Sequence, residues 1–494
     1  MKKNVLALSI AAMIGGLGFA GAASAQVADT LQVNESGTGH MLLVPYYTAQ
    51  NGNMTVFHVV NTDTSNGKAM KVRFRGASNS DDVLDFQVFM SPGDVWTAAV
   101  VKGADDVASL VTSDGTCTLP AIAKNTPVSF VQDRLPAAMT AADKASNTRE
   151  GYVEIFNMAD ITDTASTGDL YDAIKHKNGV APCTDSVLQA TLTTGAGTAG
   201  LAVPTSGLLG SWYIMNVPQT TTFAGSATAI LAVTPAGTPA VTRNVFSPQA
   251  NGAATLASAD PLFKSGIIAA QQYDVPDLST PYLNATPVTQ TGADLQATAL
   301  VTALAKTAVL NQYANDSVVS AKTDWVFSMP TRRYAIAANY AAASTATVAN
   351  TQTATKATTY RVINEGVSNS IFANSANTNV NSIGQICASS IGATFFDREE
   401  TSRVQGAVFS PGTVTNTPLC GEVSVLSFAD SGASVLGATV ARSNVTGVYQ
   451  NGWGRIAFGG NVPMLGSAFI KLTNPNVGAG MSGTYGITWP HAHK

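Results

Sequence analysis

Between residues 40 and 101 the chain alternates apolar and polar side chains with a period of two. In one part of this stretch the apolar positions are Val72 and Phe74, and the positions around them are Lys71, Arg73 and Arg75. A period of two places successive side chains on opposite faces of a β-strand, so the pattern predicts strands with one buried and one wet face. Turn sequences between the apolar runs, such as Asn51-Gly52, predict that these strands are antiparallel neighbours.

Short apolar runs of the same kind recur along the rest of the chain. They are Gly151–Asn157, Trp212–Val217, Ala227–Val233, Trp325–Met329, Tyr360–Asn364, Glu422–Phe428, Arg455–Phe458 and Ala468–Thr473. Many short strands separated by turn signals are typical of packed antiparallel sheets. The predicted fold class is therefore mainly β, with antiparallel, immunoglobulin-like β-sandwich domains and one or two short helices.

Two segments carry a helical pattern instead. Residues 294–313 place Leu300, Leu304 and Ala308 at a spacing of four, with Leu295 one turn earlier, which favours an amphipathic helix. A second, shorter helix is predicted from Asp169 to His176.

The first 25 residues have the three parts of a cleavable signal peptide. These are Lys2 and Lys3, an apolar stretch, and the small residues Ala23-Ser24-Ala25. Past residue 25 no apolar run is long enough to predict a membrane-spanning helix. We therefore exclude residues 1–25 from the fold and expect a secreted protein at the cell surface, outside the outer membrane.

Chain length and two low-complexity stretches, near 193–200 and 344–358, predict three domains. The first is an N-terminal β-sandwich over residues 26–200. The second is a middle β domain over residues 201–343, which contains the predicted helix near 294–313. The third is a C-terminal β domain over residues 344–494, and strands from distant parts of the chain can also make these domains discontinuous.

Charged residues make up only 12% of the chain, about half of the usual ~25%. Thr, Ala, Ser, Asn, Gly and Val take their place, which predicts a neutral, hydroxyl-rich surface. The net charge is -4, and Lys and Arg are scattered. Nucleic acid is therefore not an expected partner.

The cysteines Cys117, Cys183, Cys387 and Cys420 belong to a chain that is expected to reach an oxidising compartment. Three pairings are possible, and local pairing would join Cys117 to Cys183 and Cys387 to Cys420. Each bridge would then close a loop within one predicted domain. A metal site is the rival interpretation, but the chain has no CxxC spacing.

No catalytic or cofactor-binding residue is predicted, because no recognisable catalytic motif is present. The densest acidic cluster contains Asp397, Glu399 and Glu400, which are the candidate ligands for a calcium ion. A charged turn, in which Arg398 offsets its neighbours, is the simpler interpretation because known calcium loops have alternating ligands and a glycine. Asp81-Asp82 is interpreted in the same way, as a solvated turn.

The aromatic and histidine residues are interpreted as structural. Trp96, Trp212, Trp325, Trp453 and Trp489 lie far apart and mostly within strand patterns, which favours core packing over a sugar-binding platform. The end of the chain, His491-Ala492-His493, is interpreted as a solvated tail that could bind a metal ion weakly.

Several motifs occur in order along most of the mature chain. They include Pro45-Tyr46-Tyr47-Thr48, Lys71-Val72-Arg73-Phe74-Arg75, Ser91-Pro92-Gly93-Asp94-Val95-Trp96, Thr323-Asp324-Trp325 and Pro330-Thr331-Arg332-Arg333-Tyr334. In these motifs the chain resembles a largely uncharacterised group of secreted proteobacterial cell-surface proteins. The resemblance implies export and a cell-surface location, and it implies no enzyme activity. In composition and length the chain is also similar to bacterial surface-layer proteins.

The leading hypothesis is a structural protein, in which identical copies assemble into a surface layer or surface fibre. The alternative is an adhesin or carbohydrate-binding surface module, for which an exposed aromatic patch would be the structural sign. An outer-membrane barrel is less favoured because the predicted strands are short. An extracellular hydrolase would need a pocket that holds two carboxylates.

Overall fold

The computed structural model describes most of the chain between residues 28 and 494. The described ranges are 28–135, 139–194, 198–241, 244–249, 275–283, 290–332, 336–338, 360–362, 378–380, 385–400, 402–404, 418–428, 434–445, 449–474, 476–478, 481 and 483–494. The predicted signal peptide and the low-complexity stretch at 344–358 lie outside these residues.

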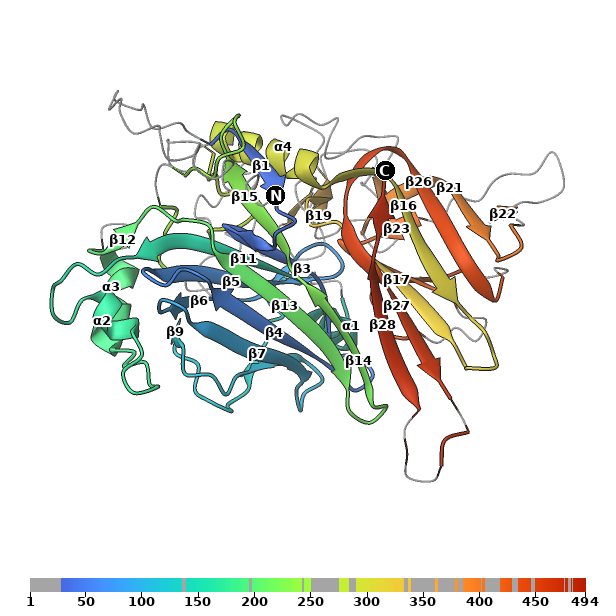
Figure 1. The fold of residues 1–494 in the computed structure, drawn as a ribbon, viewed down its shortest axis with the longest axis horizontal. Coiled ribbons are helices and arrows are strands. Elements are labelled where there is room, and N and C mark those ends of the chain that lie inside the picture. The colour runs from blue at the N-terminus through green and yellow to red at the C-terminus, as the bar shows by residue number, and fades with distance from the viewer. Residues whose placement is uncertain are drawn as a thin grey trace, which may run out of the picture.

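The first half of the described chain forms two packed sheets, shown in blue and green in Figure 1. Sheet A has the order β1 (Thr30–Val33), β15 (Thr228–Val233), β3 (Met41–Thr48), β11 (Glu150–Ile161), β5 (Gly67–Gly76), β6 (Asp82–Met90) and β9 (Cys117–Leu119), and β12 (Leu201–Ala202) pairs with β11. Sheet B has the order β10 (Val128–Ser129), β8 (Ala108–Val111), β7 (Val95–Lys102), β4 (Asn53–Asn61), β13 (Leu208–Asn216) and β14 (Thr221–Ser226), and β2 (Thr38–Gly39) pairs with β13.

The second half forms another pair of packed sheets, in yellow to red in Figure 1. Sheet C has the order β20 (Thr378–Val380), β21 (Ile386–Phe396), β26 (Asn451–Pro463), β16 (Ala305–Ala314) and β29 (Ala492–His493), and both β22 (Ser402–Val404) and β23 (Pro418–Cys420) pair with β21. Sheet D has the order β25 (Arg442–Asn444), β24 (Val423–Ser427), β17 (Lys322–Ser328), β27 (Leu465–Thr473) and β28 (Thr484–Pro490). The strands β18 (Ile336–Ala338) and β19 (Tyr360–Val362) pair with each other in a separate two-stranded sheet.

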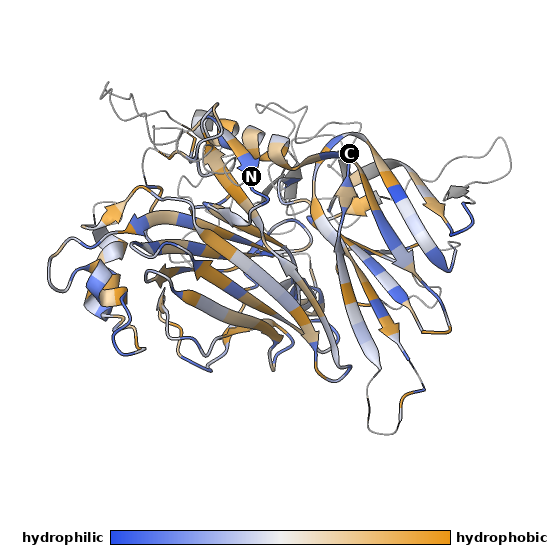
Figure 2. Ribbon diagram, viewed as in Figure 1, coloured by the Kyte–Doolittle hydropathy of each residue, from blue (hydrophilic) through white to orange (hydrophobic). Residues whose placement is uncertain are grey.

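These sheets confirm the predicted fold class, because the period of two places one face of each strand in a core. In the first sandwich Val72 and Phe74 of β5 are fully buried opposite Phe57 of β4 and Trp96 of β7. In the second sandwich the buried indole of Trp325 lies at the centre. Figure 2 shows the resulting hydrophobic and hydrophilic bands along the strands.

Helices lie at the margins of the sheets. They are α1 (Ala141–Thr148), α2 (Leu170–Ile174), α3 (Asp185–Thr194) and α4 (Gln290–Leu304). The helix predicted near residue 170 is confirmed as α2, whose N-cap is Asp169. None of the helices in the described ranges is long and apolar enough to cross a membrane.

The helix predicted over 294–313 is correct only in its first half. Leu300 and Leu304 are buried in α4, but the chain becomes strand β16 at Ala305, and Ala308 is buried within that strand. A small apolar residue fits the core face of either element, so spacing alone did not reveal the change.

The strands of the predicted middle domain are divided between the two sandwiches. β13, β14 and β15 complete sheets A and B, whereas β16 and β17 belong to sheets C and D. Within residues 201–343 β13 pairs with its neighbour β14, but both belong to sheet B, so the described strands of this range form no separate sandwich.

The two sandwiches share a continuous core. Val326 of β17 and Phe469 of β27 belong to the same buried cluster as Trp212 of β13. The backbone amide of Val423 donates to the carbonyl of Ala77 at 3.0 Å. Edge strands β14 and β28 also pack closely, because a Cβ on Gly486 would lie 2.2 Å from the carbonyl oxygen of Thr222. The sandwiches therefore contact each other through both core and edge.

Candidate functional site

The predicted wet face of β5 is buried, so that part of the sequence interpretation is wrong. Lys71 and Arg73 have no exposed surface, and Arg75 has 3%. A later part of the chain covers them: the Arg73 Nη2 donates to the carbonyl of Pro276 at 3.3 Å, and the Lys71 Nζ donates to Gln249 Oε1 at 3.0 Å. Sheet A is thus covered on both faces.

Acidic side chains neutralise these buried cations. Asp82 pairs with Arg73 and, at 3.1 Å, with the Nη1 of Arg134. Asp85 pairs with Lys71, and although burial alone would raise the pKa of Asp85, Lys71 and Arg73 hold that pKa below its usual range. The predicted solvated turn at Asp81-Asp82 is therefore wrong, since both residues are buried and Asp82 belongs to this network.

The same network extends along sheet A. The Arg75 Nε lies 3.5 Å from Glu154 Oε1, and the Lys68 Nζ lies 2.7 Å from Asp160 Oδ1. Burial raises the pKa of Glu154 despite the attraction of Arg75. Because each of these cations has an acidic partner and is closed off from solvent, we interpret the network as structural.

Two buried carboxylates hold one loop between the sandwiches. Glu150 Oε1, in β11, accepts from the backbone amide of Thr439 at 2.7 Å, and Asp324 Oδ2, in β17, accepts from the amide of Leu436 at 3.0 Å. Burial raises the pKa of Glu150 although its hydrogen bonds with Thr439 and Gln50 oppose the shift, and burial likewise raises the pKa of Asp324. Loop 434–440 is thereby fixed to both halves of the molecule.

The predicted solvated tail is correct in that Ala492 and His493 are exposed, but the end of the chain is an ordered strand rather than a free tail. β29 pairs with β16, and His491 stacks on Phe327 with ring centroids 4.8 Å apart. The His491 Nδ1 accepts from Asn311 Nδ2 at 2.8 Å, and its Nε2 donates to the carbonyl of Val326 at 2.9 Å. Burial lowers the pKa of His491 to about 4.

Both predicted disulfides are present. Cys117 is bonded to Cys183, and Cys387 is bonded to Cys420. The first bridge ties β9 to the segment between α2 and α3, and the second joins the adjacent strands β21 and β23. Structural disulfides indicate folding in an oxidising compartment outside the cytoplasm.

The acidic cluster forms a turn after β21. The backbone amide of Glu399 donates to Asp397 Oδ1 at 3.0 Å, and Glu399 and Glu400 are exposed. Within the described ranges, no group of three or more His, Cys, Asp or Glu side chains is placed to hold a metal ion. The calcium site at Asp397, Glu399 and Glu400 therefore stays a prediction.

The tryptophans separate into two groups. Trp96, Trp212 and Trp325 are buried, as predicted. Trp453 is 41% exposed and Trp489 is 47% exposed, so the prediction of core packing is wrong for these two. One sequence signal indicates exposure of Trp453: Arg455 lies two residues later and therefore on the same face of β26.

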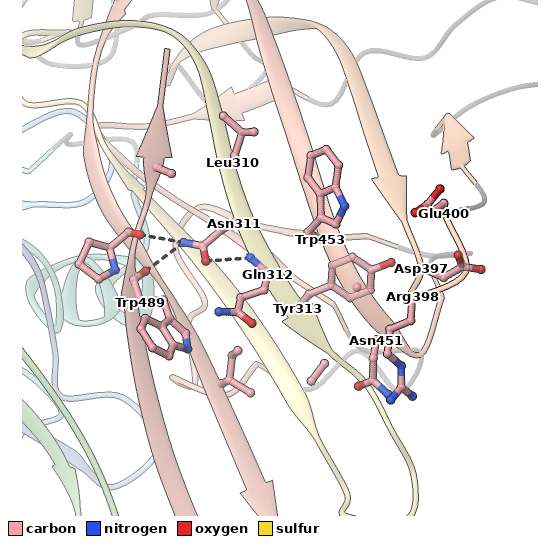
Figure 3. Close-up of a pocket in the computed structure, with 15 residues that line it drawn as sticks. Leu310, Asn311, Gln312, Tyr313, Asp397, Arg398, Glu400, Asn451, Trp453 and Trp489 are labelled. Atoms are coloured by element: carbon pink, nitrogen blue, oxygen red, sulfur yellow. Dashed lines mark hydrogen bonds between the residues drawn. The ribbon is translucent and has the colours of Figure 1, made fainter.

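The two exposed indoles border one groove at the edge of the second sandwich, which we call the Trp453–Trp489 groove (Figure 3). Its volume is about 820 Å³. The polar side chains and the tyrosine that also border it come from β16, the turn after β21 and the start of β26: Asn311, Gln312, Tyr313, Asp397, Arg398, Glu400 and Asn451. Asp397 and Glu400, two members of the predicted acidic cluster, border this groove on the side opposite Trp489 (Figure 3).

No known protein family, curated protein or solved structure matches this chain. The architecture and the groove therefore carry the functional argument.

Proposed function

We propose that this protein is a non-catalytic structural component of a bacterial cell surface, whose copies assemble into a layer or fibre. The observation that carries the proposal is the placement of its charges. The chain has few charged residues, and many of them are buried in sheet A and at the contact between the sandwiches. The buried ones include Lys68, Lys71, Arg73, Arg75, Asp82, Arg134, Glu150, Glu154, Asp160 and Asp324.

This placement favours contact between copies. Like charges on neighbouring molecules repel one another, and a high net charge keeps proteins apart in solution. Here the net charge is only -4, and burial removes further charged groups from the surface. Copies can therefore approach closely with little electrostatic cost.

The rigidity of the molecule supports the same proposal. A coat subunit has to keep its contact surfaces in a fixed relation, because symmetric assembly repeats the same contact. Loop 434–440 joins the two sandwiches through Glu150 and Asp324, and each sandwich carries one disulfide. The loop thus ties the two sandwiches to each other, and each disulfide ties segments within one sandwich.

Export supports the proposed location. The disulfides indicate an oxidising compartment, and the signal-peptide pattern of residues 1–25 would direct the chain there. The resemblance to secreted cell-surface proteins agrees with this location.

The test is assembly of the purified mature protein, residues 26–494. We expect sedimentation to show concentration-dependent growth into large particles, and electron microscopy to show ordered sheets or filaments. Parallel samples with calcium and with a chelator determine whether assembly needs the ion. A monodisperse monomer at every concentration in both samples would contradict the proposal.

A second candidate function is an adhesin or carbohydrate-binding surface module. The specific observation in its favour is the pair of exposed tryptophans that border the Trp453–Trp489 groove. Exposed aromatic groups gathered at one site commonly mark a place of recognition.

A further inference from the structure

We propose that the Trp453–Trp489 groove binds a neutral oligosaccharide chain, with the two indoles stacking against sugar rings. This inference goes beyond assembly of copies and deepens the second candidate function, on which it rests. It assigns the groove a ligand class and gives its residues separate roles.

Trp453 is held in place by an aromatic neighbour. Its indole stacks on Phe396 of the neighbouring strand, with ring centroids 4.4 Å apart and an angle of 11° between the planes. One face of the indole is therefore supported by Phe396, and 41% of the residue stays exposed. A supported and exposed aromatic ring is a rigid platform, which a ligand can contact with little loss of side-chain entropy.

The backbone of Trp489 is held by hydrogen bonds and by strand pairing. The Asn311 Nδ2 donates to the carbonyl of Trp489 at 3.0 Å and to that of Pro490 at 3.3 Å (Figure 3). The antiparallel pairing of β28 with β27 also places Trp489 opposite Ala468. The backbone of the second indole is thus anchored to both sheets of the sandwich, although the strand lies at an edge.

Side chains that donate and accept hydrogen bonds border the groove together with the two indoles. Figure 3 shows Gln312 on β16 between Trp489 on one side and Trp453 on the other. Amides such as Gln312 and Asn451 offer both donors and acceptors, and Asp397 and Arg398 add an acceptor and a donor. Sugar rings need this combination, because their C–H faces are apolar and their hydroxyl groups donate and accept hydrogen bonds.

The charge and the volume of the groove suit a short neutral chain. The charged groups at the groove are Asp397, Arg398 and Glu400, which include two acids and one base. This set gives no net attraction to an anionic chain, so a neutral sugar fits better than an acidic one. A volume of about 820 Å³ lies within the range of small-ligand sites and suits a short run of sugar rings.

The sugar chain has two possible sources: polysaccharide of the producing cell, and glycans of another surface or of the medium. The test therefore has two arms. The first uses surface polysaccharide purified from the producing strain, and the second uses soluble neutral glucans, xylans and mannans. Binding to full-length mature protein is measured by titration calorimetry and by tryptophan fluorescence.

We expect saturable binding in at least one arm, and at least tenfold weaker binding for both Trp453→Ala and Trp489→Ala. The matched control is Tyr485→Ala, because Tyr485 is 63% exposed on the same strand as Trp489 and does not border the groove. This control should bind as tightly as the unchanged protein. Circular dichroism and thermal unfolding of each variant check that it is folded.

Absence of binding in both arms, or equal binding by the folded tryptophan variants, would overturn the inference. Sedimentation of the same proteins separates this result from the proposed coat function. Sugar binding without assembly supports the groove and contradicts the coat, whereas assembly without sugar binding does the reverse. If the tryptophan variants lose assembly and no sugar binds, the groove is a contact between copies and the inference fails.

Discussion

The two sandwiches place their polar and aromatic side chains in opposite ways. In the first, Lys71 and Arg73 lie inside, paired with acids under a covering segment of chain. In the second, Trp453 and Trp489 lie outside, around an open groove. Our proposals assign these features different roles: the buried ion pairs of the first sandwich stabilise the fold, and the exposed tryptophans of the second form the proposed binding surface.

The largest expected effect comes from breaking the buried ion pairs of the first sandwich. Asp82→Ala removes the acid that pairs with both Arg73 and Arg134. Removing one partner of a buried pair typically lowers the free energy of unfolding by about 3–5 kcal/mol, because a buried charge is left without its partner. Denaturant unfolding measures the change.

The control for this variant is Asp106→Ala. Asp106 forms a pair with Lys102 at 2.5 Å, but its side chain is 63% exposed. Exposed pairs contribute little to the free energy of unfolding, because solvent screens the two charges. Equal effects of the two variants would contradict the view that burial makes the first sandwich depend on its ion pairs.

Removing one disulfide at a time should have an effect of nearly the same size. The Cys117–Cys183 bridge spans 66 residues and the Cys387–Cys420 bridge spans 33. On the chain-entropy relation each bridge stabilises the fold by about 4 kcal/mol, with slightly more for the longer loop. Paired Cys→Ser variants, unfolded in denaturant, test the values. Thiol labelling of the unreduced, denatured protein should find no free cysteine, and labelling of all four would refute the pairing.

A moderate effect is expected at the contact between the sandwiches. Glu150→Gln replaces an acceptor of the Thr439 amide with a group that presents donors as well. We expect a loss of about 1–3 kcal/mol in the free energy of unfolding, because a buried hydrogen-bonding group loses its partner.

The pH dependence of this variant gives an independent check. Burial raises the pKa of Glu150 in the folded protein, so the folded state binds the proton more tightly than the unfolded state does. This contribution to stability therefore falls as pH rises from the ordinary carboxyl range through the raised pKa. In the Glu150→Gln variant, the free energy of unfolding should no longer fall with pH over this range. An unchanged dependence of that free energy on pH would contradict the assignment to Glu150.

The smallest expected effect on stability is that of Trp453→Ala. Its indole is partly exposed and contacts Phe396, so its loss should cost about 1 kcal/mol from the aromatic pair. Thermal unfolding measures this value. A loss as large as that for Asp82→Ala would show that Trp453 belongs to the core, and the contrast between the sandwiches would not hold.

Much of the fold could be predicted from local sequence pattern, because strand periodicity depends on neighbouring residues. Val72 and Phe74 lie in the core of the first sandwich as their spacing predicts. The burial of Lys71 could not be predicted locally, since Gln249, which contacts it, lies far along the chain. The pairing of β13 with β4, which divides the predicted middle domain, is likewise a long-range contact.

The groove was only partly predictable for a similar reason. The sequence marks Asp397 and Glu400 as an acidic cluster, but it does not show that β26 and β28 bring Trp453 and Trp489 to the same place. A strand pattern tells which residues share a face and does not tell whether another sheet covers that face. The resemblance to cell-surface proteins likewise gave a location and no site.

Electron microscopy of the native cell surface tests the central claim most directly. Cells that produce the protein are compared with cells whose gene for it is deleted, and with cells that carry the restored gene. The account predicts a periodic coat or surface fibres that contain the protein, disappear on deletion and return on restoration. A surface that is identical in all three, with the protein present as isolated molecules, would contradict a structural coat function.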